Sequence, residues 1–304
     1  MTKVAPLTIR KPILICLRLV GALVLAAVAL APQAALAEGG PKHLFYTLGG
    51  PNPDAEELWA IQLSGSKITT TEIGAQAGGG CASLAMSPLT GKLYSMCVHD
   101  PSKFPNDPMY LVTIDTNSGL AIFPPLSAPN TNTGIMAMAF SPDGTLYAVG
   151  GCFPYPAPPA EGGSFDCNPS APGFNTLYTV DVNTGALTPI GSGTGAPEYF
   201  MDLAFDRNGN LFGETSTLLP AYPPAVLYQI DTTTGKATNP VNLVGSSTLM
   251  GLAFDQNGKL YATDFTLNPG FYLIDPKTGF ERPIGALPFP FSTGLELADP
   301  LKAR

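Results

Sequence analysis

Hydrophobic and polar residues alternate in short segments that recur along the chain. The clearest copy is residues 251–264, GLAFDQNGKLYATD, in which two apolar segments flank a polar Asn-Gly pair. Alternation of this kind is typical of a β-strand with one buried face, and Asn-Gly favours a tight hairpin turn. The pattern therefore predicts a strand, a turn and a second strand.

Three near-copies of this hairpin unit precede it. They are residues 83–96 (SLAMSPLTGKLYSM), 137–150 (AMAFSPDGTLYAVG) and 202–215 (DLAFDRNGNLFGET). A second unit follows each of the four copies and ends in a glycine: YLVTIDTNSG at Gly119, TLYTVDVNTG at Gly185, VLYQIDTTTG at Gly235 and FYLIDPKTG at Gly279. Internal repeats built from short strands indicate a β-propeller, in which each repeat forms one blade.

The repeats predict five four-stranded blades, whose strands we name A to D from the axis outward. Strands B, C and D of blade one are residues 43–48, 58–63 and 67–73, with no strand A before them. The later blades cover approximately residues 83–126, 135–190, 200–244 and 249–284. Residues 293–297 (TGLEL) then form an orphan strand A. We expect this C-terminal strand to complete blade one, which closes the ring and removes exposed sheet edges.

The N-terminal segment has the features of a secretory signal peptide. Basic residues precede an apolar run at residues 19–31, which is too short to span a bilayer comfortably. Residues 35–37 (Ala-Leu-Ala) match the small-residue cleavage pattern. We predict cleavage after Ala37, a single propeller domain at residues 38–304, and a periplasmic or secreted monomer that is not inserted in a membrane. The alternative is an uncleaved anchor.

Removing residues 1–37 makes the chain more acidic. That segment holds four basic residues and no acidic ones, so the net charge falls from −8 to −12. A nucleic acid or an anionic membrane requires a basic face, and neither is expected as a partner.

Four cysteines follow the predicted cleavage point: Cys81, Cys97, Cys152 and Cys167. An even number in an exported chain indicates disulfide bonds. Cys81 and Cys97 are equidistant from the turn near Leu89, so they should face each other across one hairpin. Cys152 and Cys167 bracket a proline-rich loop. We predict the pairs 81–97 and 152–167; metal binding is the alternative, although no spacing is Cys-x-x-Cys.

The repeated units resemble those of secreted propellers with the pattern GLAFxxDGxLYAxD and LYxIDxxTG. They are also similar to NHL-repeat and gluconolactonase-like propellers. The resemblance covers nearly all of the chain after residue 37 and implies a blade rather than an activity. Gluconolactonase-like propellers hold a divalent metal near the axis, and the resemblance therefore implies a metal site as one possibility.

The connections between strands B and C are long and irregular, whereas the A–B and C–D turns are short. In a propeller the B–C and D–A connections share one face, which we call the loop-rich face. Loops on a rigid scaffold commonly carry binding residues. The candidate ligand-binding residues on this face are Tyr155, Tyr199, Phe200, Asp202, Tyr222 and Phe265. The alternative is that the aromatic side chains pack on one another and cover the blade ends.

Acidic residues form a second candidate site near the axis. Asp202 stands where the other repeats carry Ser83, Ala137, Gly251 and Gly294. Together with Glu214 and Glu296 it forms a candidate metal set for Ca²⁺ or another divalent cation, or a candidate acid–base pair. Solvated carboxylates lining a wet channel are the alternative.

Other catalytic patterns are weak. Residues 206–210 (DRNGN) look like the start of a calcium loop, but the repeats place them in an A–B turn. His43 and His99 are the only histidines, and no G-x-S-x-G nucleophile turn accompanies them. We expect a non-catalytic binding or interaction module for a small molecule, a glycan or a protein. A metal-dependent lactonase-type hydrolase is the alternative, and a metal-free lyase or glycan-active enzyme is a third.

Overall fold

The computed structural model describes eight stretches of the chain. They are residues 42–50, 56–75, 80–98, 109–123, 133–154, 174–216, 225–245 and 248–301. The chain divides into two units at Leu36/Ala37, and all of these stretches belong to the second. Across them, no helix is long and apolar enough to cross a membrane.

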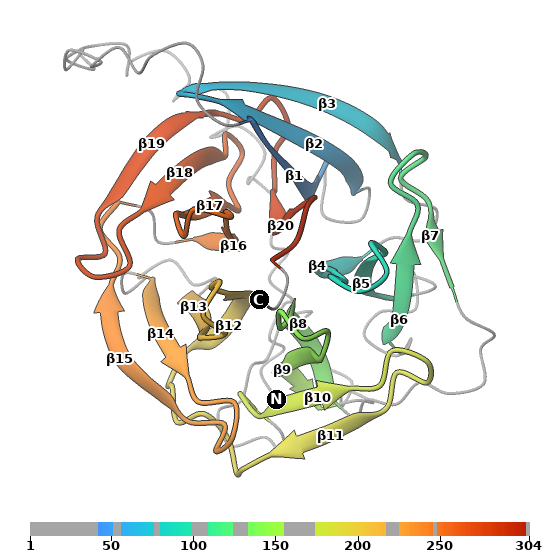
Figure 1. Ribbon diagram of the computed structural model, residues 1–304, viewed down its shortest axis with the longest axis vertical. Coiled ribbons are helices and arrows are strands. Elements are labelled where there is room, and N and C mark those ends of the chain that lie inside the picture. Colours follow the sequence, from blue (N-terminus) through green and yellow to red (C-terminus); the bar gives the residue numbers. More distant parts are fainter. Residues whose placement is uncertain are drawn as a thin grey trace, which may run out of the picture. The chain divides into compact units, whose positions relative to one another are not determined.

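Five four-stranded antiparallel sheets stand around a common axis, as predicted (Figure 1). In order from the axis outward, blade one consists of β20 (Thr293–Leu297), β1 (Lys42–Gly49), β2 (Glu57–Ser64) and β3 (Lys67–Ala75), and blade two of β4 (Cys81–Met86), β5 (Leu93–Val98), β6 (Met109–Ile114) and β7 (Ala121–Ile122). Blade three consists of β8 (Thr133–Phe140), β9 (Leu146–Pro154), β10 (Leu177–Val180) and β11 (Leu187–Ile190), and blade four of β12 (Tyr199–Phe205), β13 (Leu211–Ser216), β14 (Val226–Ile230) and β15 (Ala237–Asn242). Blade five consists of β16 (Leu249–Phe254), β17 (Leu260–Asp264), β18 (Gly270–Ile274) and β19 (Glu281–Ala286).

The C-terminal strand closes the ring as expected. Strand β20 pairs antiparallel with β1, from Phe45 opposite Leu297 to Leu48 opposite Thr293. The first and last strands of the propeller therefore lie in one sheet (Figure 1). Unfolding of either end must break the same blade.

The short turns are stabilised by their own aspartates. In the A–B turn of blade four, Asp206 Oδ1 accepts hydrogen bonds from the amides of Asn208 (2.8 Å) and Asn210 (2.9 Å). This geometry confirms that DRNGN is a hairpin turn. The aspartates that open the C–D turns each accept a bond from the amide two residues later, which is typical of an Asx turn: Asp115, Asp181, Asp231 and Asp275.

The hydrophobic core lies between the blades. In the described residues, five clusters of buried apolar side chains fill the five junctions between neighbouring blades. At the junction of blades five and one, the Phe45 ring packs against Tyr261 and Phe271 with centroid distances of 5.1 and 5.6 Å. Burying one such side chain contributes about 1.5–3 kcal/mol to folding. Each blade is therefore stabilised mainly by its two neighbours.

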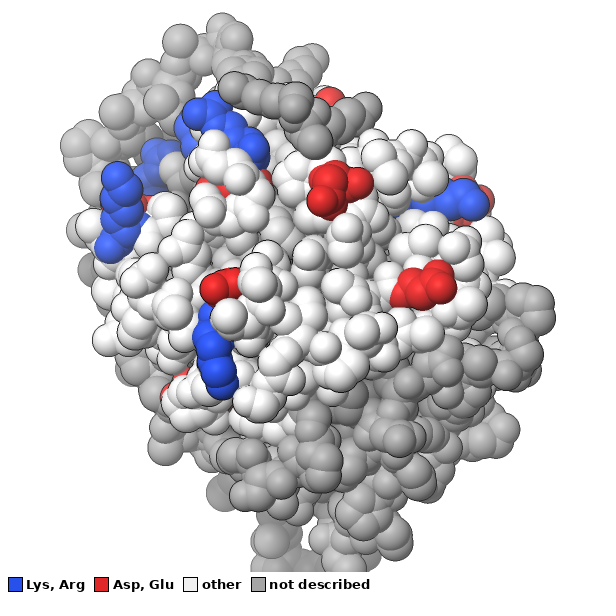
Figure 2. Space-filling view, turned by 60° about the horizontal axis from the view of Figure 1, so that its bottom comes forward, with Lys and Arg blue, Asp and Glu red and all other residues white. Residues whose placement is uncertain are grey.

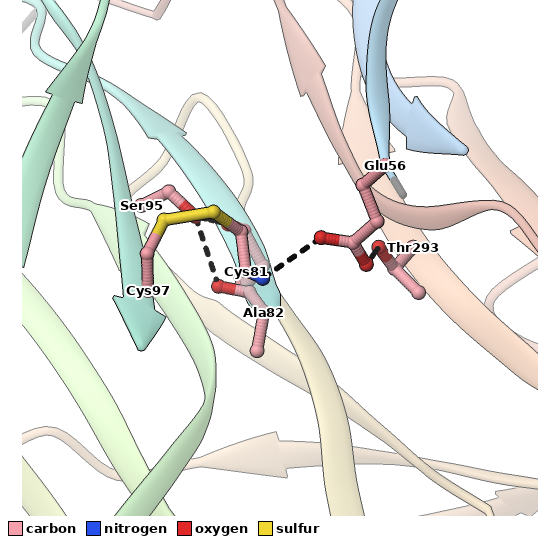
Figure 3. The surroundings of a disulfide bond; sticks show 7 residues. Glu56, Cys81, Ala82, Ser95, Cys97 and Thr293 are labelled. Carbon is pink, nitrogen blue, oxygen red and sulfur yellow. Dashed lines mark hydrogen bonds between the residues drawn. A yellow bond between two sulfur atoms is a disulfide. The ribbon is translucent and has the colours of Figure 1, made fainter. Parts of the chain in front are cut away.

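One disulfide bond joins the two inner strands of blade two. Cys81 on β4 and Cys97 on β5 lie opposite each other and are bonded, which confirms this predicted pair (Figure 3). Cys167 and the side chain of Cys152 lie outside the described residues, so their pairing stays a prediction.

Candidate functional site

Asp202 lies at the axis, where it connects the innermost strands. It is the fourth residue of β12, and its side chain is completely buried. Its Oδ1 accepts hydrogen bonds from Ser83 Oγ (2.7 Å) and the Leu203 amide (3.0 Å). Its Oδ2 accepts from the amides of Leu252 (2.8 Å) and Leu295 (3.2 Å). One carboxylate therefore holds strands of blades one, two, four and five.

Ser83 extends this connection to blade three. The Met138 amide on β8 donates to Ser83 Oγ at 2.9 Å, while the same hydroxyl donates to Asp202. All five innermost strands are thus joined through two side chains. Gly294 allows the close approach that this requires: it has φ +56°, and an added Cβ would lie 2.7 Å from the Leu84 amide nitrogen.

The environment of Asp202 changes its protonation. Burial raises the pKa of its carboxyl to about 7, and the hydrogen bonds from Ser83 and the three amides limit the rise. The carboxylate is therefore a buried acid whose charged form is stabilised by directed donors.

Glu296 lies farther along β20, at the end of the channel formed by the A–B turns. It lines a cavity of about 30 Å³ with Phe205, Phe254 and Leu301. Its carboxyl accepts hydrogen bonds from the amides of Met86 and Leu297. Burial, together with the charge of Asp202, raises its pKa to about 8. A space of this size holds at most about one water molecule.

Glu214 lies on β13 directly opposite Asp202 in the strand register. Its side chain is fully buried, and neither of its carboxyl oxygens has a hydrogen-bond partner among the described residues. Burial raises its pKa well above the ordinary value, and the charges of Asp202 and Glu281 raise it further. Both effects favour the protonated, neutral form of this carboxyl group.

The surroundings of these acids can be compared with the needs of a calcium site. Calcium requires several oxygen ligands, but Asp202 is surrounded by N–H and O–H donors, which point their hydrogen atoms at the carboxylate. In the eight stretches of the chain that the structure describes, no group of three or more His, Cys, Asp or Glu side chains is placed to hold a metal ion. Metal binding by Asp202, Glu214 and Glu296 stays a prediction for direct metal analysis.

The loop-rich face carries two pairs of partly exposed aromatic side chains. Phe174 and Tyr199 meet edge to face with centroids 5.7 Å apart, and Phe265 and Phe291 lie 5.0 Å apart. Two of the aromatic candidates, Tyr199 and Phe265, are therefore at the predicted face and packed against a neighbour.

The remaining aromatic candidates differ in their placement. Phe200 is completely buried, and its ring packs against Tyr228 in the core between blades three and four. It supports the scaffold in this structure rather than presenting a surface. Tyr155 and Tyr222 lie outside the described residues.

Glu56 is a structural residue that the sequence did not reveal. It precedes β2, and its Oε2 accepts a hydrogen bond from the Cys81 amide at 2.8 Å (Figure 3). Its other oxygen accepts from Thr293 Oγ1 at 3.4 Å. Glu56 thus links blades one and two beside the disulfide. In the sequence it stands beside Glu57 and looks like an ordinary surface charge.

His43 has a comparable role at the opposite face. Its Nε2 lies 3.3 Å from Asp255 Oδ2, and both side chains are buried. This contact connects β1 with the A–B turn of blade five. His99, the other histidine, lies outside the described residues.

Comparisons with known proteins add information on the fold. No protein-family model and no curated protein matches the sequence. A chain from a crystal structure of a nidogen/laminin complex superposes with a TM-score of 0.50 at 10% identity, covering 85% of this chain and 98% of that one.

Two bacterial structures are also similar. One is a protein of unknown function from Bacteroides caccae, with a TM-score of 0.46 and 13% identity over 85% of this chain and 99% of that one. The other is a gluconolactonase from Xanthomonas campestris, with a TM-score of 0.42 and 10% identity over 82% of this chain and 77% of that one. At 10% identity, the superposition on the nidogen/laminin structure supports the fold alone.

Proposed function

We propose that this protein is an exported, non-catalytic binding module that uses the loop-rich face. The observation that carries the proposal is the arrangement at the axis. Asp202 is fully buried, and both of its oxygens accept hydrogen bonds from the protein itself. A catalytic acid or base must reach its substrate. The axial carboxylate instead holds the scaffold together, which leaves the surface loops for recognition.

The aromatic pairs at the loop-rich face support the location of the binding surface. Aromatic side chains bury a large area at a low cost in conformational entropy, and they are enriched where proteins bind partners. Phe174 with Tyr199 and Phe265 with Phe291 are partly exposed and fixed by mutual contact. The nidogen/laminin structure shows that a similar propeller takes part in a protein complex. A protein partner is therefore our first choice for this face.

Surface variants test this proposal. The mature protein should retain a specific partner from extracts of its source, and Tyr199→Ser with Phe265→Ser should weaken retention at least about tenfold, as loss of interface aromatics does. Asp299→Asn, an exposed substitution remote from this face, is the matched control. If the aromatic double variant retains the partner as well as Asp299→Asn does, and the melting temperatures are unchanged, the loop-rich face is not the binding surface.

A second candidate function rests on Glu214. Its buried carboxyl group has no hydrogen-bond partner in the part of the chain that the structure describes, which calls for an explanation, and acids with raised pKa values are common in active sites. It keeps the lactonase-type hydrolase as an alternative. Hydrolysis of a panel of lactones and esters by the wild type and by Glu214→Gln distinguishes the two functions. The hydrolase requires that the wild type hydrolyses a substrate and that the variant does not. The binding module requires that neither protein hydrolyses any of them.

A further inference from the structure

A groove lies between blades four and five, on the face formed by the short A–B and C–D turns. Its volume is about 560 Å³, which is within the usual range of about 300–1,000 Å³ for ligand pockets. The apolar part of its lining includes Phe212, Leu227, Val241 and Phe254. The groove is on the face opposite to the one that carries the proposed function.

The neighbouring junction differs from this one at two residues that line the groove. Between blades three and four, the hydroxyl of Tyr147 on β9 hydrogen-bonds the side chain of Thr232 in the next C–D turn. The equivalent residues between blades four and five are Phe212 and Pro276, as the repeats LYAVG/LFGET and DTTTG/DPKTG show. Neither of these can form that bond, and both line the groove. Two departures from the repeat thus remove one bridge at a single place.

The charges at the two junctions also differ. Arg207 and Lys277 line the groove between blades four and five. In the repeats, Pro142 and Thr233 take the equivalent positions between blades three and four, and the acidic Asp143 stands beside Pro142. Among the described contacts, neither Arg207 nor Lys277 forms an ion pair. Asp206 also lines the groove, and its carboxylate accepts hydrogen bonds from Asn208 and Asn210. The groove therefore carries two cations against one carboxylate, whereas the positions equivalent to Arg207 and Lys277 at the neighbouring junction carry no cation.

Two such cations are notable because this protein carries few charged groups. Charged residues are 12% of the chain, and most of the described surface in Figure 2 is uncharged. Primary amides add to the polar lining on both walls, with Asn208, Gln229 and Asn239 from blade four and Asn257 from blade five. An amide can both donate to and accept from a hydroxyl group.

We propose that this groove binds a short acidic oligosaccharide, with its carboxylates at Arg207 and Lys277. The partly exposed Phe212 ring supplies an apolar surface for a sugar ring, and the amides hydrogen-bond the sugar hydroxyls. The guanidinium of Arg207 matches a carboxylate in a bidentate geometry. A neutral sugar lacks the groups that these cations recognise, so the site discriminates by charge.

Calorimetric titration of the mature protein with a short oligogalacturonate tests the proposal. The expected result is saturable binding that weakens as salt is added, because exposed charges are screened. Arg207→Ala with Lys277→Thr should weaken binding at least about tenfold, which corresponds to about 1.4 kcal/mol. A neutral maltooligosaccharide of equal length should bind far more weakly. No saturable binding by the wild type, or equal binding by the double variant, overturns the proposal.

The repeats also supply a variant that closes the groove. Phe212→Tyr with Pro276→Thr installs the bridge of the neighbouring junction, so it should abolish binding without lowering the melting temperature. Tyr147→Phe is the matched control, because it removes that bridge between blades three and four and should leave binding unchanged. Full binding by the closing variant would contradict the assignment of this groove. The loop-face variants Tyr199→Ser and Phe265→Ser leave the groove intact and should bind the oligosaccharide normally. Failure of the proposed function is therefore distinguished from failure of this proposal.

Discussion

The axis and the groove between blades four and five both contain charged side chains, but these side chains have opposite roles. At the axis, the oxygens of Asp202 are engaged by the Leu203 amide of its own strand and by donors from three other strands, and the side chain is not exposed. In the groove, Arg207 and Lys277 form no ion pair among the described residues and face an open space. A polar group whose partners are all inside the protein stabilises the fold, whereas one left without partners beside a cavity is available for a ligand.

Ring closure should give the largest effect on the axial side of this comparison. Deleting residues 293–304 removes β20, its pairing with β1, and the Leu295 amide that donates to Asp202. We expect loss of the cooperative thermal transition, because the other strands of blade one are left without an inner neighbour. Differential scanning calorimetry measures this, and an unchanged melting temperature would show that β20 does not close the ring.

Substitution of Asp202 should give the next largest effect. Asp202→Ala should lower the free energy of unfolding by about 4 kcal/mol or more, because four buried donors lose their acceptor at about 1–3 kcal/mol each. Asp202→Asn keeps one acceptor oxygen and should cost about half as much. Urea unfolding provides the measurement, with the exposed Asp299→Asn as control, expected within about 0.5 kcal/mol of the wild type. A harmless Asp202→Ala would contradict the proposed clamp.

The pH dependence of stability should give a smaller effect. The pKa values of Asp202 and Glu296 are raised to about 7 and about 8, from ordinary values of 3.8 and 4.5. The folded protein therefore keeps protons that the unfolded chain releases. The free energy of unfolding falls as the pH rises from the ordinary pKa values of these groups to their raised values. We expect a melting temperature several degrees higher at pH 5 than at pH 8.

Glu296→Gln tests the origin of this pH dependence. The neutral amide removes one titrating group, so the difference in melting temperature between pH 5 and pH 8 should shrink relative to the wild type. A wild-type protein that gains stability as the pH rises through this range would show that the buried carboxyls are not the controlling groups.

The features that the sequence predicted are those that depend on neighbouring residues or on counting repeats. Asp206 and Gly209 define a turn by themselves, and Cys81 and Cys97 face each other because one hairpin separates them. The orphan strand at residues 293–297 has no other sheet to join. Each of these inferences needed only local geometry and the repeat pattern.

The partners of Asp202 could not be predicted in the same way. Its donors, Ser83, Leu252 and Leu295, come from three other blades and meet only when the ring is closed. The sequence marked Asp202 as an exception among small residues, but an exception of this kind suits a metal ligand as well as a clamp. The sequence does contain a sign of the groove, because Phe212 and Pro276 stand at the repeat positions that Tyr147 and Thr232 hold in the preceding blades. That signal acquires meaning only once neighbouring blades are known to place these pairs together.

The most direct test of the structural role of Asp202 is thermal unfolding of the wild type and Asp202→Asn, each with calcium and with a chelator, together with metal analysis of both. Our account predicts a lower melting temperature for the variant by the same amount in both conditions, and no bound metal that the variant loses. A stoichiometric ion in the wild type that stabilises it and is absent from Asp202→Asn would contradict the account, and would make the axis a metal centre.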